Sequence, residues 1–384
     1  MKLTHIEVIT ADQLNAADLA LWSQCLKQRP ELWGPYFDVR YFQAIAKTVP
    51  QAFIARLYSG DRLVGFFPFQ KRGRIIQAFG APLTDFQAVI AVENIDLSDL
   101  VSLLKARRFE FQGLIDLSAP CESPQTQKRL YADLSAGFET YFSGNYEQHK
   151  KVFRNTERCR RNLNKDYPDL VFSWGAVTPE TLKWIVDCKR SQYRQSGLHD
   201  VFACGWTGDM LHALAKQNSD DFALMAGVYR HGERIIAAEV ALKSGSDLHL
   251  WFPGYDPTFA RYGVGILMTL DIMKAVSGHV KRVDFGCGDE AYKSPLTTHS
   301  GLCWEGHVSA VPFRHQPLRR MNGLRAQLMR RLRIVRACEL KLSGQLHGGW
   351  QIVRRAIKRS RLSMSMAISV ALPELLLRGT YAGF

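Results

Sequence analysis

Two β-hairpin patterns of the same kind recur in this chain at a spacing of 172 residues. The first covers residues 52–69 and turns at Gly60, and the second covers residues 222–242 and turns at Gly232. Two further matches keep nearly the same spacing and order, namely 80–86 with 254–259 and 114–118 with 282–286. Three ordered matches favour an internal duplication, which predicts two similarly folded halves.

The second half also contains a crossover unit. A strand over 248–252, which Pro253 is expected to interrupt, leads into a glycine-rich loop, a helix that Gly278 ends, and a strand over 280–285. Two strands joined by a helix are parallel neighbours in one sheet. The chain is therefore expected to have a mixed α/β fold with layers of helix and sheet.

Charge divides the chain into a body and a tail. The net charge is +14, yet nearly all of it lies in residues 314–384, where basic side chains greatly outnumber Glu339 and Glu374. We expect boundaries at 1–145, 146–313 and 314–384, with a basic helical tail as the last part.

Composition and cysteine spacing restrict the class of protein. Apolar residues make up 46% and charged residues 22% of the chain, which excludes wholesale disorder. The 8 cysteines form no CxxC pair, so a zinc ribbon and a dithiol redox motif are excluded. Scattered thiols, with neither a secretory signal nor an apolar run long enough to span a membrane, predict a cytoplasmic protein.

The loop before the crossover helix is the sharpest candidate binding element. It consists of Arg261, Tyr262, Gly263, Val264 and Gly265. Glycines let the backbone approach a ligand, and the free N–H groups of the first helical turn can seat a pyrophosphate. The pattern is neither GxGxxG nor a P-loop, and an ordinary helix-initiating turn is the alternative interpretation.

Glu239 lies in an otherwise apolar strand. A carboxylate there needs a partner or a raised pKa, so it is a candidate general base if the strand faces a cleft. The alternative is a side chain that points outward or pairs with a structural arginine.

The segment 284–293 follows the last strand of the crossover unit, where ligands bind in sheets of this kind. Its ionisable side chains are Asp284, Asp289, Glu290, Tyr292 and Lys293. A polar loop is the alternative. A basic helix over 150–165 could likewise face phosphates or solvent.

These residues resemble the GNAT acyltransferases, and more closely the bacterial CelD-like branch named for cellulose biosynthesis. That branch is similar to a tandem of two GNAT-like halves, as are the Fem-type peptidyltransferases. The resemblance rests on Arg158, Arg160 and Arg161 of the basic helix, the run 251–256, the loop before Gly265 and the motif over 284–293. It is strongest in residues 150–295. The family's loop usually begins with Gln or Arg, where this chain has Ala260.

The resemblance implies two tandem GNAT-like halves and acyl-CoA as co-substrate, without a metal. It places the CoA pyrophosphate on the backbone around residues 262–266, and the pantetheine between two strands that splay apart near Phe252 and Phe285. The expected cofactor-binding residues are Phe252, Arg261, Tyr262, Gly263, Val264, Gly265 and Ile266.

We assign catalytic roles by inference. Glu239 is expected to act as base and Tyr292 as acid, while a backbone N–H near Phe252 polarises the thioester carbonyl. The acceptor is expected to contact Trp251, Asp284, Asp289 and Lys293.

The predicted activity is transfer of an acyl group from acyl-CoA to an amine, on an amino sugar or lipid-linked sugar of a surface polysaccharide. Two alternatives stay open. One is a Fem-type transferase that uses aminoacyl-tRNA, and the other is a scaffold without activity in a polysaccharide-biosynthesis complex.

The tail carries an apolar stripe at helical spacing, formed by Leu318, Met321, Leu324, Leu328, Leu332 and Val335. A second basic segment, 354–361, precedes an uncharged one. The tail is expected either to pack on the body or to dock on an anionic membrane at its inner face. Nucleic acid is a poorer fit, because few aromatic residues interleave with the charges.

Overall fold

The computed structural model describes residues 1–115, 125–288, 290–310 and 323–360. The first half contains β1 (His5–Ile9), α1 (Ala16–Gln28), α2 (Val39–Ile45), β2 (Ala52–Ser59), β3 (Arg62–Arg72), β4 (Ile75–Ala78), β5 (Ile90–Ala91), α3 (Leu97–Leu103), β6 (Arg108–Leu114) and β7 (Gln125–Asp133). The second contains α4 (Phe138–Gln148), α5 (Lys150–Asp166), β8 (Leu170–Ala176), α6 (Pro179–Ser196), α7 (Trp206–Ala215), β9 (Phe222–His231), β10 (Arg234–Ser244), β11 (Asp247–Tyr255), α8 (Val264–Ala275), β12 (Arg282–Cys287) and β13 (His299–Ser309). Helices α9 (Gly323–Cys338) and α10 (Leu342–Ser360) follow.

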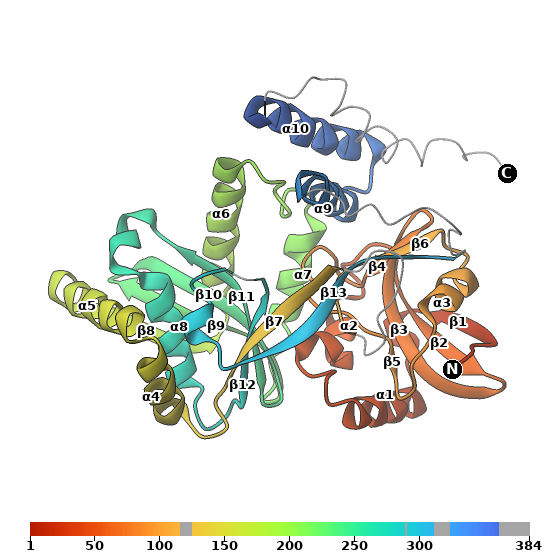
Figure 1. Ribbon diagram of the computed structural model, residues 1–384, viewed down its shortest axis with the longest axis horizontal. Helices are drawn as coiled ribbons and strands as arrows, with labels where there is room; N and C mark the ends of the chain where they lie inside the picture. The colour runs from red at the N-terminus through yellow and green to blue at the C-terminus, as the bar shows by residue number, and fades with distance from the viewer. Residues whose placement is uncertain (116–124, 289, 311–322, 361–384) are drawn as a thin grey trace.

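The two halves share one mixed sheet and exchange their last strands. The strand order is β1-β2-β3-β4-β6-β13-β7-β12-β11-β10-β9-β8, with β5 paired to β3 (Figure 1). Each half has an antiparallel hairpin, β2–β3 or β9–β10, followed by a parallel pair, β4–β6 or β11–β12. Strand β7 pairs with β12 of the second half, and β13 pairs with β6 of the first. The predicted mixed α/β fold with two similar halves is confirmed.

The largest hydrophobic cluster draws side chains from both halves. The buried ring of Tyr36 contacts Trp251 of the other half at a centroid distance of 5.8 Å, and the buried Trp22 and Met210 belong to the same cluster. Because one apolar core spans the junction, the halves pack as one body rather than as separate domains.

Strands β11 and β12 pair over a short stretch and then diverge. Their parallel pairing ends at His249 and Asp284, although β11 continues to Tyr255. Pro253 was expected to interrupt this strand, and that expectation is wrong. Proline lacks a backbone N–H, and beyond the divergence no strand among the described residues pairs with the β12-facing side of β11.

Helix α9 packs across both halves. Its Arg336 forms an ion pair of 2.8 Å with Glu110 of β6, and both side chains are buried. The Nε1 of Trp206 donates a hydrogen bond to the carbonyl oxygen of Cys338. Leu332 and Val335 of the predicted stripe are buried, whereas Leu318 and Met321 lie outside the described residues. The described part of this helix is therefore a packed element of the fold.

Helix α10 lies on α9, on the side away from the sheet (Figure 1). In the part of the chain that the structure describes, no helix combines the length and the hydropathy needed to cross a bilayer.

We expect Arg336→Met to lower the free energy of unfolding by about 3 kcal/mol, because the substitution leaves the buried Glu110 short of one of its cations. Arg330→Met is the matched control on the same helix. Arg330 is partly exposed and its partner Glu305 keeps Arg333, so the loss there should stay below about 1 kcal/mol. Urea unfolding measures both, and equal losses would contradict this account of how α9 is held.

Candidate active site

The loop before α8 forms an open helix N-terminus. Gly263 has φ +61° and ψ +34°, the left-handed conformation that glycine adopts most easily, and it joins the short helical turn Pro257–Tyr262 to α8. A Cβ atom on Gly265 would meet no other atom within 4 Å. The first turn of α8 is therefore accessible beside Gly265, where its backbone N–H groups have no partner within the helix.

The diverging end of β11 carries a β-bulge. Val240 of β10 pairs with Phe252 and Ala241 pairs with Leu250, so Trp251 is an extra residue. A bulge leaves backbone groups of the extra residue unpaired. It also places Trp251 and Phe252 in the same hydrophobic cluster, with ring centroids 4.8 Å apart.

Glu239 points into the core toward α8. It is 5% exposed, and its Oε2 accepts a hydrogen bond of 3.1 Å from Thr269. Burial raises the pKa of Glu239 to about 7, although the Thr269 hydrogen bond and the charge on Lys189 oppose this rise. A carboxyl group with this pKa exchanges its proton readily near neutral pH.

The segment after β12 is held by its own contacts. Lys293 is buried, lies 2.8 Å from a carboxylate oxygen of Glu290 and donates to the carbonyl oxygen of Cys287. Tyr292 is about half exposed, and burial together with the charges on Glu290 and Glu239 raises its pKa to about 12, so its hydroxyl stays protonated. Asp289 lies outside the described residues.

Sequence analysis missed His249, which joins the two halves. His249 is completely buried on β11, its Nε2 lies 3.0 Å from Asp85 of the first half, and its Nδ1 lies 3.4 Å from Asp284 of β12. Burial works against a charged imidazole, but the carboxylates of Asp284 and Asp85 outweigh it and raise the pKa of His249 to about 9. His249 could have been found from the sequence in the same way as Glu239, because both are ionisable residues in otherwise apolar strands.

Asp284 is paired rather than presented to a ligand. Arg129 of β7 donates hydrogen bonds of 2.6 and 2.9 Å to its Oδ2, and both side chains are buried. Burial alone would raise the pKa of Asp284, but the charges on Arg129 and His249 hold it at about 2. Asp284 was predicted to contact the acceptor, and in the structure its buried side chain lies between Arg129 and His249.

A cavity of about 220 Å³ lies where the two halves meet. Its lining includes Asp85, Tyr193, His199, Trp251, Phe252 and Arg331 of α9. The carboxylate of Asp85 is partly exposed, and Trp251 Nε1 donates to the carbonyl oxygen of Leu83. The cavity therefore adjoins the diverging part of β11 and contains a carboxylate supplied by the first half.

The remaining predicted residues lie around the start of α8. Arg261 is largely exposed and bonds to the hydroxyl of the buried Tyr262, which also donates to Asp166. Val264 is buried and Ile266 is partly buried. The structure thus brings Trp251 and Phe252 to the cavity, while the glycine loop lies at the same end of β11.

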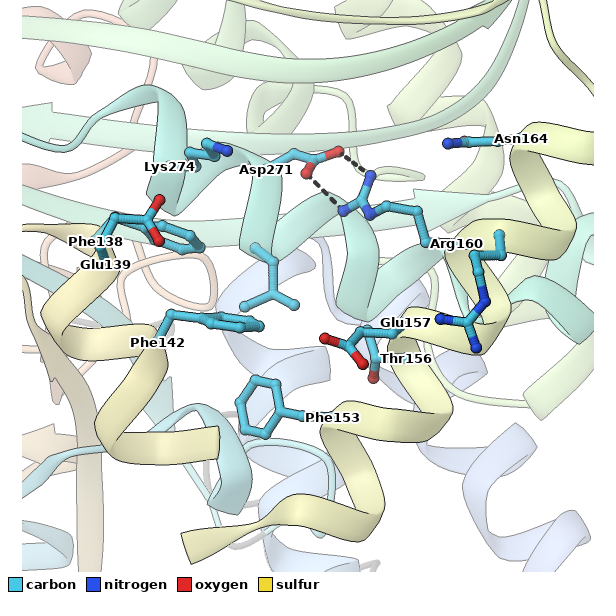
Figure 2. A pocket seen from close by; sticks show the side chains of 12 residues that line it. Phe138, Glu139, Phe142, Phe153, Thr156, Glu157, Arg160, Asn164, Asp271 and Lys274 are labelled. Carbon is cyan, nitrogen blue, oxygen red and sulfur yellow. Dashed lines mark hydrogen bonds and ion pairs between the residues drawn. The ribbon is translucent and has the colours of Figure 1, made fainter. Parts of the chain in front are cut away.

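A larger pocket, of about 610 Å³, lies elsewhere on the second half, between α4, α5 and α8. Figure 2 shows the phenylalanine rings at its floor and Arg160 bonded through both terminal nitrogens to Asp271. Asp271 is seven residues along α8 from Val264, which corresponds to about 10 Å of helix. This pocket is therefore separate from the helix N-terminus. Arg160 of the basic helix, which could have faced phosphates or solvent, pairs with a carboxylate.

Residues 150–294 match the protein-family model described as Acetyltransferase (GNAT) domain. A search of curated proteins finds no match to the chain. The matched region includes Glu239, the glycine loop and Tyr292.

Three of the solved structures that match this chain each cover most of it. A tandem GNAT protein from the clavulanic acid biosynthesis pathway is 9% identical with a TM-score of 0.47, and the match covers 80% of this chain and 99% of that one. FemX is 12% identical with a TM-score of 0.46, and the match covers 80% and 97%. An acetyltransferase of the GNAT family from Colwellia psychrerythraea is 10% identical with a TM-score of 0.41, and the match covers 78% and 98%.

The His249 contacts predict how stability depends on pH. The pKa of His249 is raised above its ordinary value of 6.5, so its contribution is complete below pH 6.5 and is lost as the pH rises through about 9. The loss should be on the order of 3 kcal/mol. Thermal unfolding between pH 6 and 10 should show it in the wild type and not in His249→Gln.

Asp85→Asn gives a second check that does not remove the imidazole. It takes away one carboxylate, so the loss of stability should begin at a lower pH than in the wild type. Identical pH profiles for all three proteins would show that His249 is not charged in the folded state.

Proposed function

We propose that this chain is an N-acyltransferase that uses acyl-CoA as its donor. The observation that carries the proposal is the separation of β11 from β12 beyond His249 and Asp284, at the end of the sheet where α8 begins. A gap between two parallel strands next to a helix N-terminus suits a donor with an extended arm and a pyrophosphate. The GNAT-type family match over the same region supports this assignment.

The donor site uses the loop and the bulge. The pyrophosphate binds backbone N–H groups of residues 262–266, beside the open space at Gly265. The pantetheine lies in the gap between β11 and β12, which brings the thioester to the bulge. The backbone N–H of Trp251, the extra residue of the bulge next to Phe252, then donates to the thioester carbonyl and stabilises the developing negative charge.

The acceptor amine binds in the cavity between the halves, where the carboxylate of Asp85 attracts its ammonium group. Glu239 takes the proton, through an intervening water because its carboxyl group does not line the cavity. The free amine attacks the thioester carbonyl, the carbon–sulfur bond breaks, and Tyr292 donates a proton to the leaving thiolate. The proton that the new amide nitrogen loses returns to Tyr292, and Glu239 releases its proton to solvent. The products are an amide and CoA.

In the described residues of the first half, the place that corresponds to the donor site is filled. Strands β4 and β6 pair only at Ile75 and Ile76, but the continuation of β6 is occupied by the chain itself. Gln87 donates to the carbonyl oxygen of Gly113 and accepts from the N–H of Ile115, which fills the place that is open in the second half. We therefore propose one acyl-CoA per chain.

We further propose that the acceptor is an amino sugar or a lipid-linked sugar of a surface polysaccharide, as in the CelD-like branch that the sequence resembles. A carboxylate next to two aromatic rings is a suitable lining for the amine and the apolar face of a sugar.

Titration calorimetry with acetyl-CoA and longer acyl-CoAs tests the donor assignment, with an expected stoichiometry of one. Gly265→Val should weaken binding at least about tenfold, because the new side chain occupies the space beside the first turn of α8. Gly208→Val is the matched control, since Gly208 lies near the start of α7 with open space beside it. Absence of acyl-CoA binding would overturn the proposal and leave the aminoacyl-tRNA and scaffold alternatives.

Initial rates against pH, with a panel of amino sugars starting from glucosamine, test the catalytic roles. The wild-type rate should rise through pH 7 as Glu239 loses its proton, and Glu239→Gln should abolish that rise and lower kcat by roughly 10²–10⁴. Tyr292→Phe should lower kcat without weakening CoA binding, and Asp85→Asn should mainly raise KM for the acceptor. A wild-type pH profile in Glu239→Gln would remove Glu239 from the mechanism.

A further inference from the structure

Helix α10 exposes a row of large apolar side chains. Leu342, Leu346 and Trp350 are 47%, 41% and 50% exposed. They are spaced four residues apart, so they form one stripe along the helix. Exposed apolar stripes of this kind on an outer helix are typical of surfaces that bind another protein or a membrane.

The opposite face of α10 is fixed to α9, which prevents the stripe from turning inward. Ile352 and Val353 are buried, and Ile352 belongs to a cluster with Leu332 and Val335 of α9. A Cβ atom on Gly348 would lie 2.7 Å from Val335, so the two helices pack closely. The stripe therefore faces away from the molecule, and Figure 1 shows α10 as its outermost helix on that side.

The charged side chains of α10 itself are all basic, while the partly buried Glu339 lies against Gly344 at the start of the helix. Helix α10 contains neither aspartate nor glutamate, Lys341 and Arg354 on either side of the stripe are exposed, and the sequence adds Arg355, Lys358 and Arg359 to its last turns. A row of leucines with a tryptophan, flanked by cations, suits the interface of an anionic bilayer, because basic residues near the surface are attracted to the lipid headgroups.

We propose that α10 docks this protein on an anionic membrane, with the stripe Leu342–Leu346–Trp350 inserted at the level of the lipid headgroups. The stripe expected from sequence was that of α9, but Leu332 and Val335 are used within the protein. The docking surface is thus confined to α10, and α9 connects it to the body.

Docking through α10 also bears on the identity of the acceptor, and this step rests on the proposed acyltransferase activity. Arg331 and Ile334 of α9 line the cavity that contains Asp85, and α10 packs on α9. A membrane bound to the exposed face of α10 therefore lies on the same side of the molecule as the wall of the cavity that α9 forms. An acceptor whose sugar is attached to a membrane lipid fits that arrangement.

Sedimentation of the full chain with vesicles tests the docking without any measurement of activity. Binding should be weak to neutral phosphatidylcholine, rise as phosphatidylglycerol is added and fall by about tenfold or more between low and high salt. Trp350→Glu and Leu346→Glu should each reduce binding at least about tenfold, since each places a charge in the interface. Leu302→Glu on β13 is the control, because Leu302 is a leucine outside α10 that is even more exposed, at 63%.

The same variants should bind acyl-CoA and unfold like the wild type, since the substituted side chains are exposed. A wild-type chain that stays in the supernatant at every composition overturns the docking proposal, as does sedimentation of Trp350→Glu equal to that of the wild type. Either result leaves acyl-CoA binding untouched, so failure of the docking and failure of the proposed function are distinguishable.

Discussion

A buried row of charges joins the two halves and sets the geometry of the site. Arg129 comes from a first-half strand, Asp284 and His249 come from the second half, and Asp85 comes from the first. Each charged group inside this row needs its oppositely charged neighbour, because a buried charge without a partner would destabilise the fold by several kcal/mol. The row alternates in sign and ends at a carboxylate in the cavity. The same contacts therefore hold the halves together and bring a first-half side chain to the site of the second.

The two similar halves differ in how their parallel strands continue. In the second half the pairing of β11 with β12 ends at His249 and Asp284, whereas in the first half the backbone at Gln87 pairs with the continuation of β6. The tight packing there is visible at Gly113, where a Cβ atom would lie 1.9 Å from the carbonyl oxygen of Asp85. The close packing around Gln87 and Gly113 thus holds Asp85 at the cavity where the two halves meet.

Local patterns predicted the elements well, and contacts between distant residues account for what they missed. The hairpins and the helix start at Gly263 depend on turn chemistry and on periodicity, which can be read within a few residues. The pairing of His249 with Asp85 joins positions far apart in the sequence and could not be seen that way. Pro253 was misjudged because its acceptability depends on where β12 leaves β11. The burial of the apolar face of α9 could not be predicted either, because an apolar stripe is equally compatible with a protein core and with a lipid surface.

The exchange of β7 and β13 has a consequence for how the chain acquires its structure during synthesis. Strand β6 is complete early, but its neighbour β13 is formed by residues 299–309, near the end of the body. Strand β7 must likewise wait for β12 before its second edge is paired. The first half therefore leaves the ribosome with an open sheet edge that persists until most of the second half has been made, which makes closure of the central strands a late and slow step.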